Sequence, residues 1–206
     1  MIQEKILNML IKNRLDEKRS MDYLVDVGAG KARYLKRLAK NYKNINFIAL
    51  DDGYGLVFKP KSDDKNLKYR RANILKLSLK SKSSDITSAF SVLPSVSAEL
   101  GFEGSKKAFS ELVRITRVGG YVVFTSASMI YSIPSKNAAE KIKNKQEFEN
   151  YRVKLSTFAS KNGLSYVKTV NDKGIPHHIF MKTKNKISTA LPYFNEKWAF
   201  KALKKM

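Results

Sequence analysis

Hydrophobic residues in this chain follow two spacings, one typical of helices and one typical of strands. Ile2, Ile6, Met9 and Leu10 recur at i, i+4, i+7 and i+8, which places them on one face of a helix. Short apolar runs bounded by glycine or polar residues predict strands. The pattern predicts, in order, a helix over 2–14, a strand over 22–27, a helix over 31–42, a strand from 45 to 51, a strand from 84, a helix over 105–118, a strand over 121–125, a helix over 147–162, and strands over 165–170 and 178–183.

Strands that alternate with helices indicate an α/β domain, and 206 residues suit one domain with a single core. The last two strands flank a turn at 171–174 and predict an antiparallel hairpin. We expect the helix over 105–118 to stop at Gly119-Gly120, and the polar segment 126–144 to form a loop that can cover a substrate.

Two glycines follow the first strand, where Gly28-Ala29-Gly30 leads into a helix. Glycine adopts positive φ and lets the backbone approach a ligand, while the helix start offers unpaired N–H groups. Asp26 precedes the turn, and its carboxylate would repel the phosphates that a dinucleotide-binding turn holds. A cationic ligand suits this turn better, although an ordinary strand-to-helix turn has the same pattern.

The segment from Asp26 to Gly30 resembles the first motif of the class I S-adenosylmethionine-dependent methyltransferases, which reads acid-x-Gly-x-Gly. The resemblance covers about 22–184. It implies a Rossmann-like seven-stranded mixed sheet, with strands 1 to 6 parallel and strand 7 antiparallel, after an N-terminal helix. It also implies S-adenosyl-L-methionine as cofactor, with Gly28, Ala29 and Gly30 under the methionine part and Asp26 helping to hold the amino-acid end.

The resemblance extends to three later strand ends. Asp51 ends the second strand, where a carboxylate can accept hydrogen bonds from both ribose hydroxyls. The family's adenine-contacting acid maps to Asn73, beside Ile74, and its amide can also bond adenine. Phe90 and Ser91 end the fourth strand and are expected to edge the cofactor pocket. The Asn/Asp-Pro-Pro-aromatic motif of adenine-N6 enzymes is absent there. The Lys-Asp-Lys-Glu set of ribose 2′-O enzymes is not evident in any register, and no catalytic residue is predicted.

The charge of the chain favours a polyanionic partner. Forty lysines and arginines against 18 acids give a net charge of +22. RNA, DNA and anionic lipid all attract such a protein, while a lysine-rich composition without such a partner gives the same number. Basic residues concentrate in 59–82 and 182–205, outside the cofactor motifs. In the tail, Trp198 and its aromatic neighbours can stack on unpaired bases, dock a short helix on the domain, or lie on a membrane surface.

The tail carries a second resemblance. Phe194-Asn195 and Trp198-Ala199 resemble the end of the ribosomal RNA adenine-N1 methyltransferases of aminoglycoside resistance, although here they follow the last predicted strand. We predict a methyltransferase that acts on RNA; the alternatives are a methyltransferase of a small molecule or lipid, and an inactive RNA-binding module of the same fold. The predicted division of the single domain 1–206 is an N-terminal helix region over 1–20, a core over 22–184, and a basic aromatic tail over 185–206.

Other chemistry has little support in the sequence. The chain has no cysteine, which excludes disulfides and thiolate metal sites. His177 and His178 are adjacent in a strand and point to opposite faces, so we expect structural roles and no metal. No apolar run reaches the length of a membrane span and the start lacks a signal-peptide pattern, which predicts a cytoplasmic protein. The sequence leaves the oligomeric state open.

Overall fold

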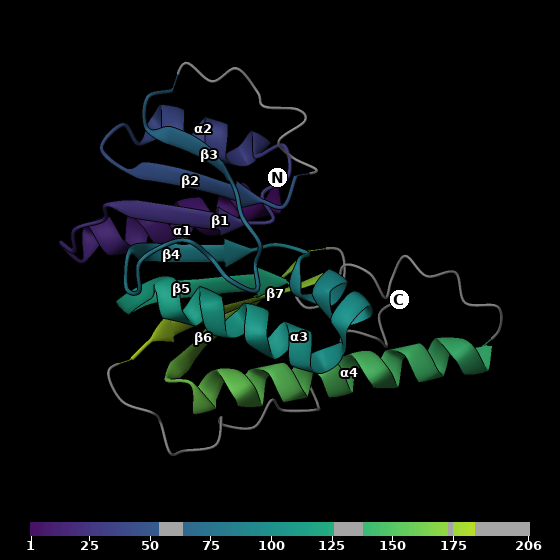
Figure 1. Ribbon diagram of the computed structural model, residues 1–206. Coiled ribbons are helices and arrows are strands. Elements are labelled where there is room, and N and C mark those ends of the chain that lie inside the picture. Colours follow the sequence, from purple (N-terminus) through teal and green to yellow (C-terminus); the bar gives the residue numbers. More distant parts are fainter. Residues whose placement is uncertain (54–63, 126–137, 173–174, 184–206) are drawn as a thin grey trace.

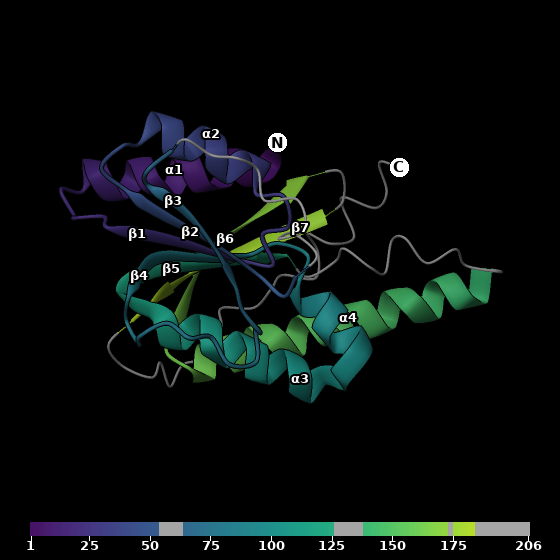
Figure 2. The same ribbon diagram turned by 45° about the horizontal axis from the view of Figure 1, so that its top comes forward.

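A seven-stranded sheet with helices on both faces forms the body of the protein (Figures 1 and 2). The computed structural model describes residues 1–53, 64–125, 138–172 and 175–183. The strand order is β3-β2-β1-β4-β5-β7-β6. The elements are α1 (Ile2–Asp16), β1 (Tyr23–Val27), α2 (Arg33–Asn41), β2 (Asn46–Asp51), β3 (Leu67–Arg71), β4 (Ser84–Ala89), α3 (Leu93–Ile115), β5 (Thr116–Thr125), α4 (Ala138–Lys161), β6 (Leu164–Asp172) and β7 (Ile175–Lys182).

The strand directions confirm the predicted mixed sheet. Neighbouring strands among β1 to β5 pair in parallel, whereas β7 pairs antiparallel with both β5 and β6. Because β7 runs against its neighbours, its first residues lie at the edge of the sheet where the parallel strands end. This edge is called the C-terminal edge below.

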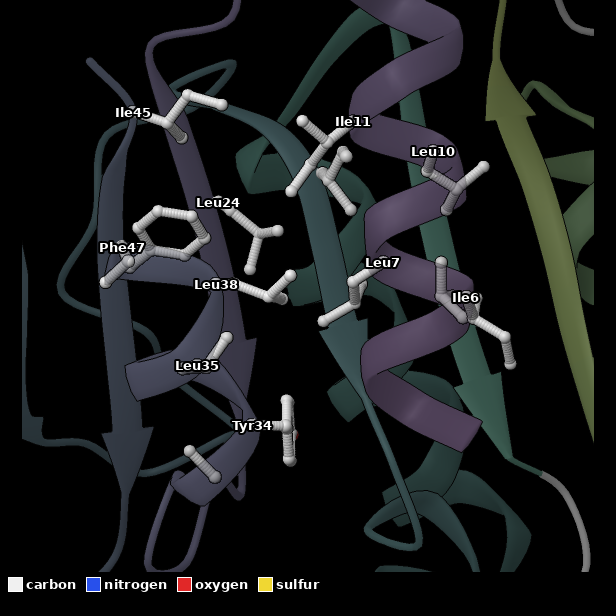
Figure 3. Packing of buried hydrophobic residues seen from close by; sticks show 14 of the residues in the cluster. Ile6, Leu7, Leu10, Ile11, Leu24, Tyr34, Leu35, Leu38, Ile45 and Phe47 are labelled. Atoms are coloured by element: carbon white, nitrogen blue, oxygen red, sulfur yellow. The ribbon is translucent and has the colours of Figure 1, made fainter. Parts of the chain in front are cut away.

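Each face of the sheet is covered by its own hydrophobic cluster. Helices α1 and α2 lie on one face and α3 and α4 on the other (Figure 2). On the first face, the inward stripe of α1 packs beside α2 and β1, as Figure 3 shows for Leu7, Leu10 and Leu24. The second cluster includes Phe109 of α3 and Phe124 of β5, whose rings meet edge to face. The helical spacing of the sequence predicted α1 and two buried residues of its stripe, Ile6 and Leu10. The predicted Ile2 and Met9 are only partly buried, and the stripe also includes Leu7 and Ile11, which the prediction did not name.

The predicted end of the helix at Gly119-Gly120 is wrong. Helix α3 begins at Leu93, has a non-helical residue at Gly101, and ends at Ile115, so both glycines belong to β5. The β4–β5 register shifts there, and Gly119 has φ +74°. A Cβ on Gly120 would lie 2.6 Å from the Asp85 carbonyl oxygen. The glycines therefore allow a bulged strand to pass close to β4, a requirement that resembles a helix-stop signal in the sequence.

The loop predicted over 126–144 is too long at its C-terminal end, because α4 begins at Ala138. Alanine, glutamate and lysine dominate its first turns, and all three favour helix even without an apolar stripe. Residues 126–137 lie outside the described residues, as does the predicted tail over 185–206. Within the described parts of the chain, no helix combines the length and the apolar content that crossing a bilayer requires.

A buried ion pair ties three strands to α1 at the opposite, N-terminal edge of the sheet. Arg14 lies 2.8 Å from Asp85, and both side chains are almost inaccessible to solvent. Asp85 also accepts the backbone N–H groups of Asp22 and Tyr23 and lies 3.0 Å from Arg117. The pair therefore joins α1 to the first residues of β1, β4 and β5.

Candidate cofactor site

The predicted cofactor residues meet at the C-terminal edge, beside the point where the strand order reverses. Strand β1 lies between β2 and β4, so the connections on its two sides run in opposite directions. Ligands of open α/β sheets bind in the crevice at such a point. The four strand ends that meet there carry Gly28, Ala29 and Gly30 after β1, Asp51 at the end of β2, Asn73 and Ile74 after β3, and Phe90 and Ser91 after β4.

The two glycines of the first turn have different tasks. The N–H groups of Gly28 and Ala29 donate to the Leu50 carbonyl at 2.8 and 3.0 Å, which folds the turn over the end of β2. Both glycines have positive φ, +69° and +52°. A Cβ on Gly28 would lie 2.1 Å from Val92 Cγ2, whereas one on Gly30 would meet nothing within 4 Å. Packing requires Gly28, and the open space beside Gly30 is where a ligand can approach the backbone.

Alanine substitutions should separate these two tasks. We expect Gly28→Ala to lower the free energy of unfolding by about 2–4 kcal/mol, through left-handed strain and the Val92 clash. Gly30→Ala should cost about 1 kcal/mol in strain and weaken cofactor binding, because its methyl group enters the open space. Urea unfolding and calorimetry measure the two effects. Adding Val92→Ala to Gly28→Ala should restore part of the lost stability; no recovery would contradict the clash.

Asp26 is at the centre of a buried hydrogen-bond network. Its side chain is fully buried and accepts hydrogen bonds from Tyr34 Oη and, at 2.6 Å, from Ser88 Oγ. Burial raises the pKa of Asp26 to about 7, although the two hydrogen bonds act in the opposite direction. The network joins β1, α2 and β4 beneath the turn. Asp26 thus holds the site together, and its predicted contact with the amino-acid end of the cofactor stays a prediction.

Asp51 links the end of β2 to the glycine turn. Its Oδ2 accepts the Gly30 N–H at 2.8 Å, and its Oδ1 accepts the Gly53 N–H at 3.3 Å. The residue is half-buried, and a carboxylate has acceptor sites beyond those two, so hydrogen bonds to ribose hydroxyls fit its chemistry. The neighbouring Asp52 is exposed, and its backbone carbonyl accepts from Arg71 Nε. The ribose contact of Asp51 stays a prediction.

The loops after β3 and β4 present the remaining predicted residues. Asn73 is exposed and shapes a tight turn, because its Oδ1 accepts the Leu75 N–H at 2.8 Å. Ile74 packs partly against the second hydrophobic cluster. Ser91 is exposed with φ +63°, a left-handed conformation that is uncommon outside glycine. Their contacts with adenine and cofactor stay predictions, and the structure brings all of them to one edge.

His177 reaches this edge as well, which the sequence analysis missed. Its ring lies edge-on to Phe90, with centroids 5.8 Å apart, and Phe90 meets Tyr34 in the same way at 5.9 Å. The available signal was the direction of the last strand. An antiparallel β7 must begin where parallel strands end, so its first residues belong to the site.

The geometry suits the group that the first resemblance implies. The site lies where the strand order reverses, and it combines an accessible glycine backbone with a carboxylate at the end of β2. These features suit the binding of an adenosyl group with a cationic amino-acid end. When bound there, S-adenosylmethionine supplies an activated methyl group on a sulfonium. Asp51 and the turn from Gly28 to Gly30 would hold it.

Comparisons with known proteins agree with this geometry. Residues 25–124 match the family model described as "Methyltransferase domain". A protein of Methanococcus maripaludis assigned as an S-adenosylmethionine-dependent methyltransferase has 18% identity and a TM-score of 0.57, over 90% of this chain and 85% of that one. A methyltransferase of the same cofactor class from Aquifex aeolicus has 16% identity and a TM-score of 0.55, over 82% and 88%.

A third similar structure is a variant of the 16S rRNA (adenine(1408)-N(1))-methyltransferase of Catenulisporales acidiphilia with its cosubstrate. It has 15% identity and a TM-score of 0.54, over 79% of this chain and 85% of that one. No curated protein matches this chain.

The fold and the site define a Rossmann-like domain of the class I methyltransferase type. The match identifies a methyltransferase domain over residues 25–124, and the fold of the chain is that of S-adenosylmethionine-dependent methyltransferases.

Proposed function

We propose that this protein is a methyltransferase that transfers the methyl group of S-adenosylmethionine to RNA. The proposal depends on the exposed charge at the edge that carries the cofactor motifs. Where β1, β2 and β3 end, over residues 28–33, 51–53 and 70–76, Asp52 is the exposed acid, and five exposed side chains are basic: Lys31, Arg33, Arg70, Arg71 and Lys76. Such a rim attracts phosphates, and each phosphate that it neutralises releases counterions.

The basic clusters of the sequence support this proposal unevenly. Residues 65–82 lie within the described part of cluster 59–82 and supply three of the five rim bases. In cluster 182–205 only Lys182 and Thr183 are described, and Lys182 Nζ donates to the carbonyls of Val113 and Thr116 at 2.6 and 2.7 Å. The Lys182 ammonium group is therefore engaged in hydrogen bonds at the end of α3. The proposed stacking by Trp198 lies outside the described residues.

Methyl transfer into separate cell fractions tests the function. Tritiated cofactor is incubated with total RNA, DNA, lipid and metabolite fractions, and we expect label in RNA. Asp51→Ala should abolish cofactor binding and transfer, since it removes the proposed ribose ligand and the support of Gly30. Asp52→Ala is the matched control and should keep both. Label in lipid or metabolites and none in RNA would overturn the RNA assignment and leave the enzyme class standing.

A double variant of two rim bases tests whether the basic rim binds phosphates. Replacing Arg33 and Lys76 by alanine should weaken RNA binding and reduce the slope of log affinity against log salt by about one for each phosphate that the variant no longer neutralises. Lys161 is exposed at the end of α4, just before β6 begins at the opposite edge, and Lys161→Ala should leave the slope unchanged. An unchanged slope in the Arg33/Lys76 variant would exclude these side chains as phosphate ligands.

A further inference from the structure

His177 has a buried nitrogen without a partner at the C-terminal edge. The residue is 2% exposed. Its Nδ1 lies 2.8 Å from Thr125 Oγ1, but its Nε2 has no hydrogen-bond partner among the described residues. An unpaired buried polar atom costs about 1–3 kcal/mol, and native proteins contain few of them. The unpaired Nε2 therefore indicates that a ligand supplies its hydrogen-bond partner.

The position of His177 places that partner beside the cofactor site. Thr125 lies directly opposite His177 in the β5–β7 ladder, and Ala89 lies opposite Phe124 in the β4–β5 ladder. Phe90 follows Ala89 and its ring contacts His177, so Phe90, Thr125 and His177 form one row across three strands. This row is the last one on the face covered by α1 and α2.

A second unpaired atom comes from α1 at the same level. Gln3 Oε1 is buried without a hydrogen-bond partner among the described residues. Gln3 lies about 16 Å along the helix from Arg14, which contacts Asp85, and Phe90 lies about 16 Å along β4 from Asp85. The chain start also lies toward the ends of the parallel strands in Figure 1. Gln3 and His177 thus both lie toward the C-terminal edge of the sheet, and each has one buried polar atom without a hydrogen-bond partner among the described residues.

We propose that His177 contacts the methyl acceptor through Nε2 and takes the proton that the acceptor loses. This rests on the proposed function, because it needs an acceptor beside the cofactor. The acceptor is an N–H or O–H group. Its lone pair forms the bond to the methyl carbon, the carbon–sulfur bond breaks with its electron pair left on sulfur, and the proton passes to Nε2 and then to water.

The surroundings of His177 suit a neutral proton acceptor. Burial lowers its pKa, which keeps the ring neutral at pH 7. Nε2 has its lone pair when Nδ1–H donates to Thr125 Oγ1. Beside the ring lies Phe90, the residue that follows β4, and Tyr34 of α2 lies beyond Phe90. On β6, Asp172 favours the charged ring once a proton has arrived.

Two variants test the proposal by rate. His177→Gln should bind S-adenosylmethionine within about twofold of the parent in calorimetry, yet its single-turnover transfer should fall about 100-fold or more and lose its dependence on pH between about 5 and 8. His178→Gln is the matched control. His178 is buried on the other face with Nδ1 2.9 Å from Thr169 Oγ1, so its loss should change stability and leave rate and pH profile alone. An unchanged rate in His177→Gln overturns the proposal.

Nitrogen NMR of the imidazoles supplies a readout that needs no turnover and no acceptor. With S-adenosylhomocysteine bound, we expect His177 as the Nδ1–H tautomer; the Nε2–H tautomer would overturn the proposal, since it leaves no lone pair for the proton. The two proposals fail separately. If label enters metabolites and not RNA, and its transfer is slowed in His177→Gln, the RNA substrate is overturned and the role of His177 stands. If His177→Gln transfers label to RNA as fast as the parent, the role of His177 is overturned and the RNA substrate stands. If no fraction takes label, the tautomer of His177 still decides whether Nε2 can accept a proton.

Discussion

Asp85→Ala is expected to lower the free energy of unfolding by about 3–5 kcal/mol. The substitution leaves the Arg14 guanidinium buried without its counter-ion, and it removes the acceptor of two backbone N–H groups at Asp22 and Tyr23. A buried charge without a partner is far more costly than a missing ion pair at the surface. Urea unfolding followed by circular dichroism measures the loss.

Two further variants show whether burial is the cause. Asp22→Ala removes only the ion pair between Arg117 and the exposed Asp22 and should cost less than about 1 kcal/mol. Arg14→Met combined with Asp85→Asn removes both charges and keeps an acceptor for the backbone, so it should be more stable than Asp85→Ala alone. A double variant as unstable as Asp85→Ala would show that the unpaired Arg14 charge is not the source of the loss.

Asp26 is expected to make the cofactor-free protein less stable as pH rises. Its pKa is about 7 in the folded protein, because of burial, against 3.8 as the reference value. Between these values the folded state binds the proton and the unfolded chain does not, so the stability due to protonated Asp26 is complete below about pH 4 and is lost by about pH 7. At about 1.4 kcal/mol for each pH unit, the change reaches about 4 kcal/mol.

The variant Asp26→Asn isolates this contribution, because it keeps the shape and a hydrogen-bonding group toward Ser88 and Tyr34 but does not titrate. The free energy of unfolding, measured at several pH values, should rise in the variant relative to the parent as pH rises from about 4 to 7. A difference that stays constant with pH would contradict the raised pKa. Cofactor binding near pH 7 gives a second measurement: if the cationic end faces Asp26, binding releases a proton that calorimetry in two buffers detects.

The sequence by itself determined the features that depend on neighbouring residues. Helical spacing predicted α1, and the pair Gly28 and Gly30 predicted a turn that can approach a ligand. The position of Asp51 directly after an apolar run predicted a carboxylate at the end of a strand. The closing hairpin followed from two β-rich runs around a short turn, and its antiparallel pairing is confirmed. These signals are local because backbone sterics and residue spacing produce them within a few positions.

Only the tertiary structure decided which distant residues meet. Nothing near Arg14 in the chain indicates that it pairs with Asp85, and the glycines at 119 and 120 signal a helix stop until β4 is seen beside them. The sequence did not indicate that burial between α2 and β4 places Asp26 in a hydrogen-bond network and raises its pKa. His177 joins the site only because β7 runs antiparallel to β5. Burial and strand direction depend on the packing of the whole domain, and no short window of sequence contains them.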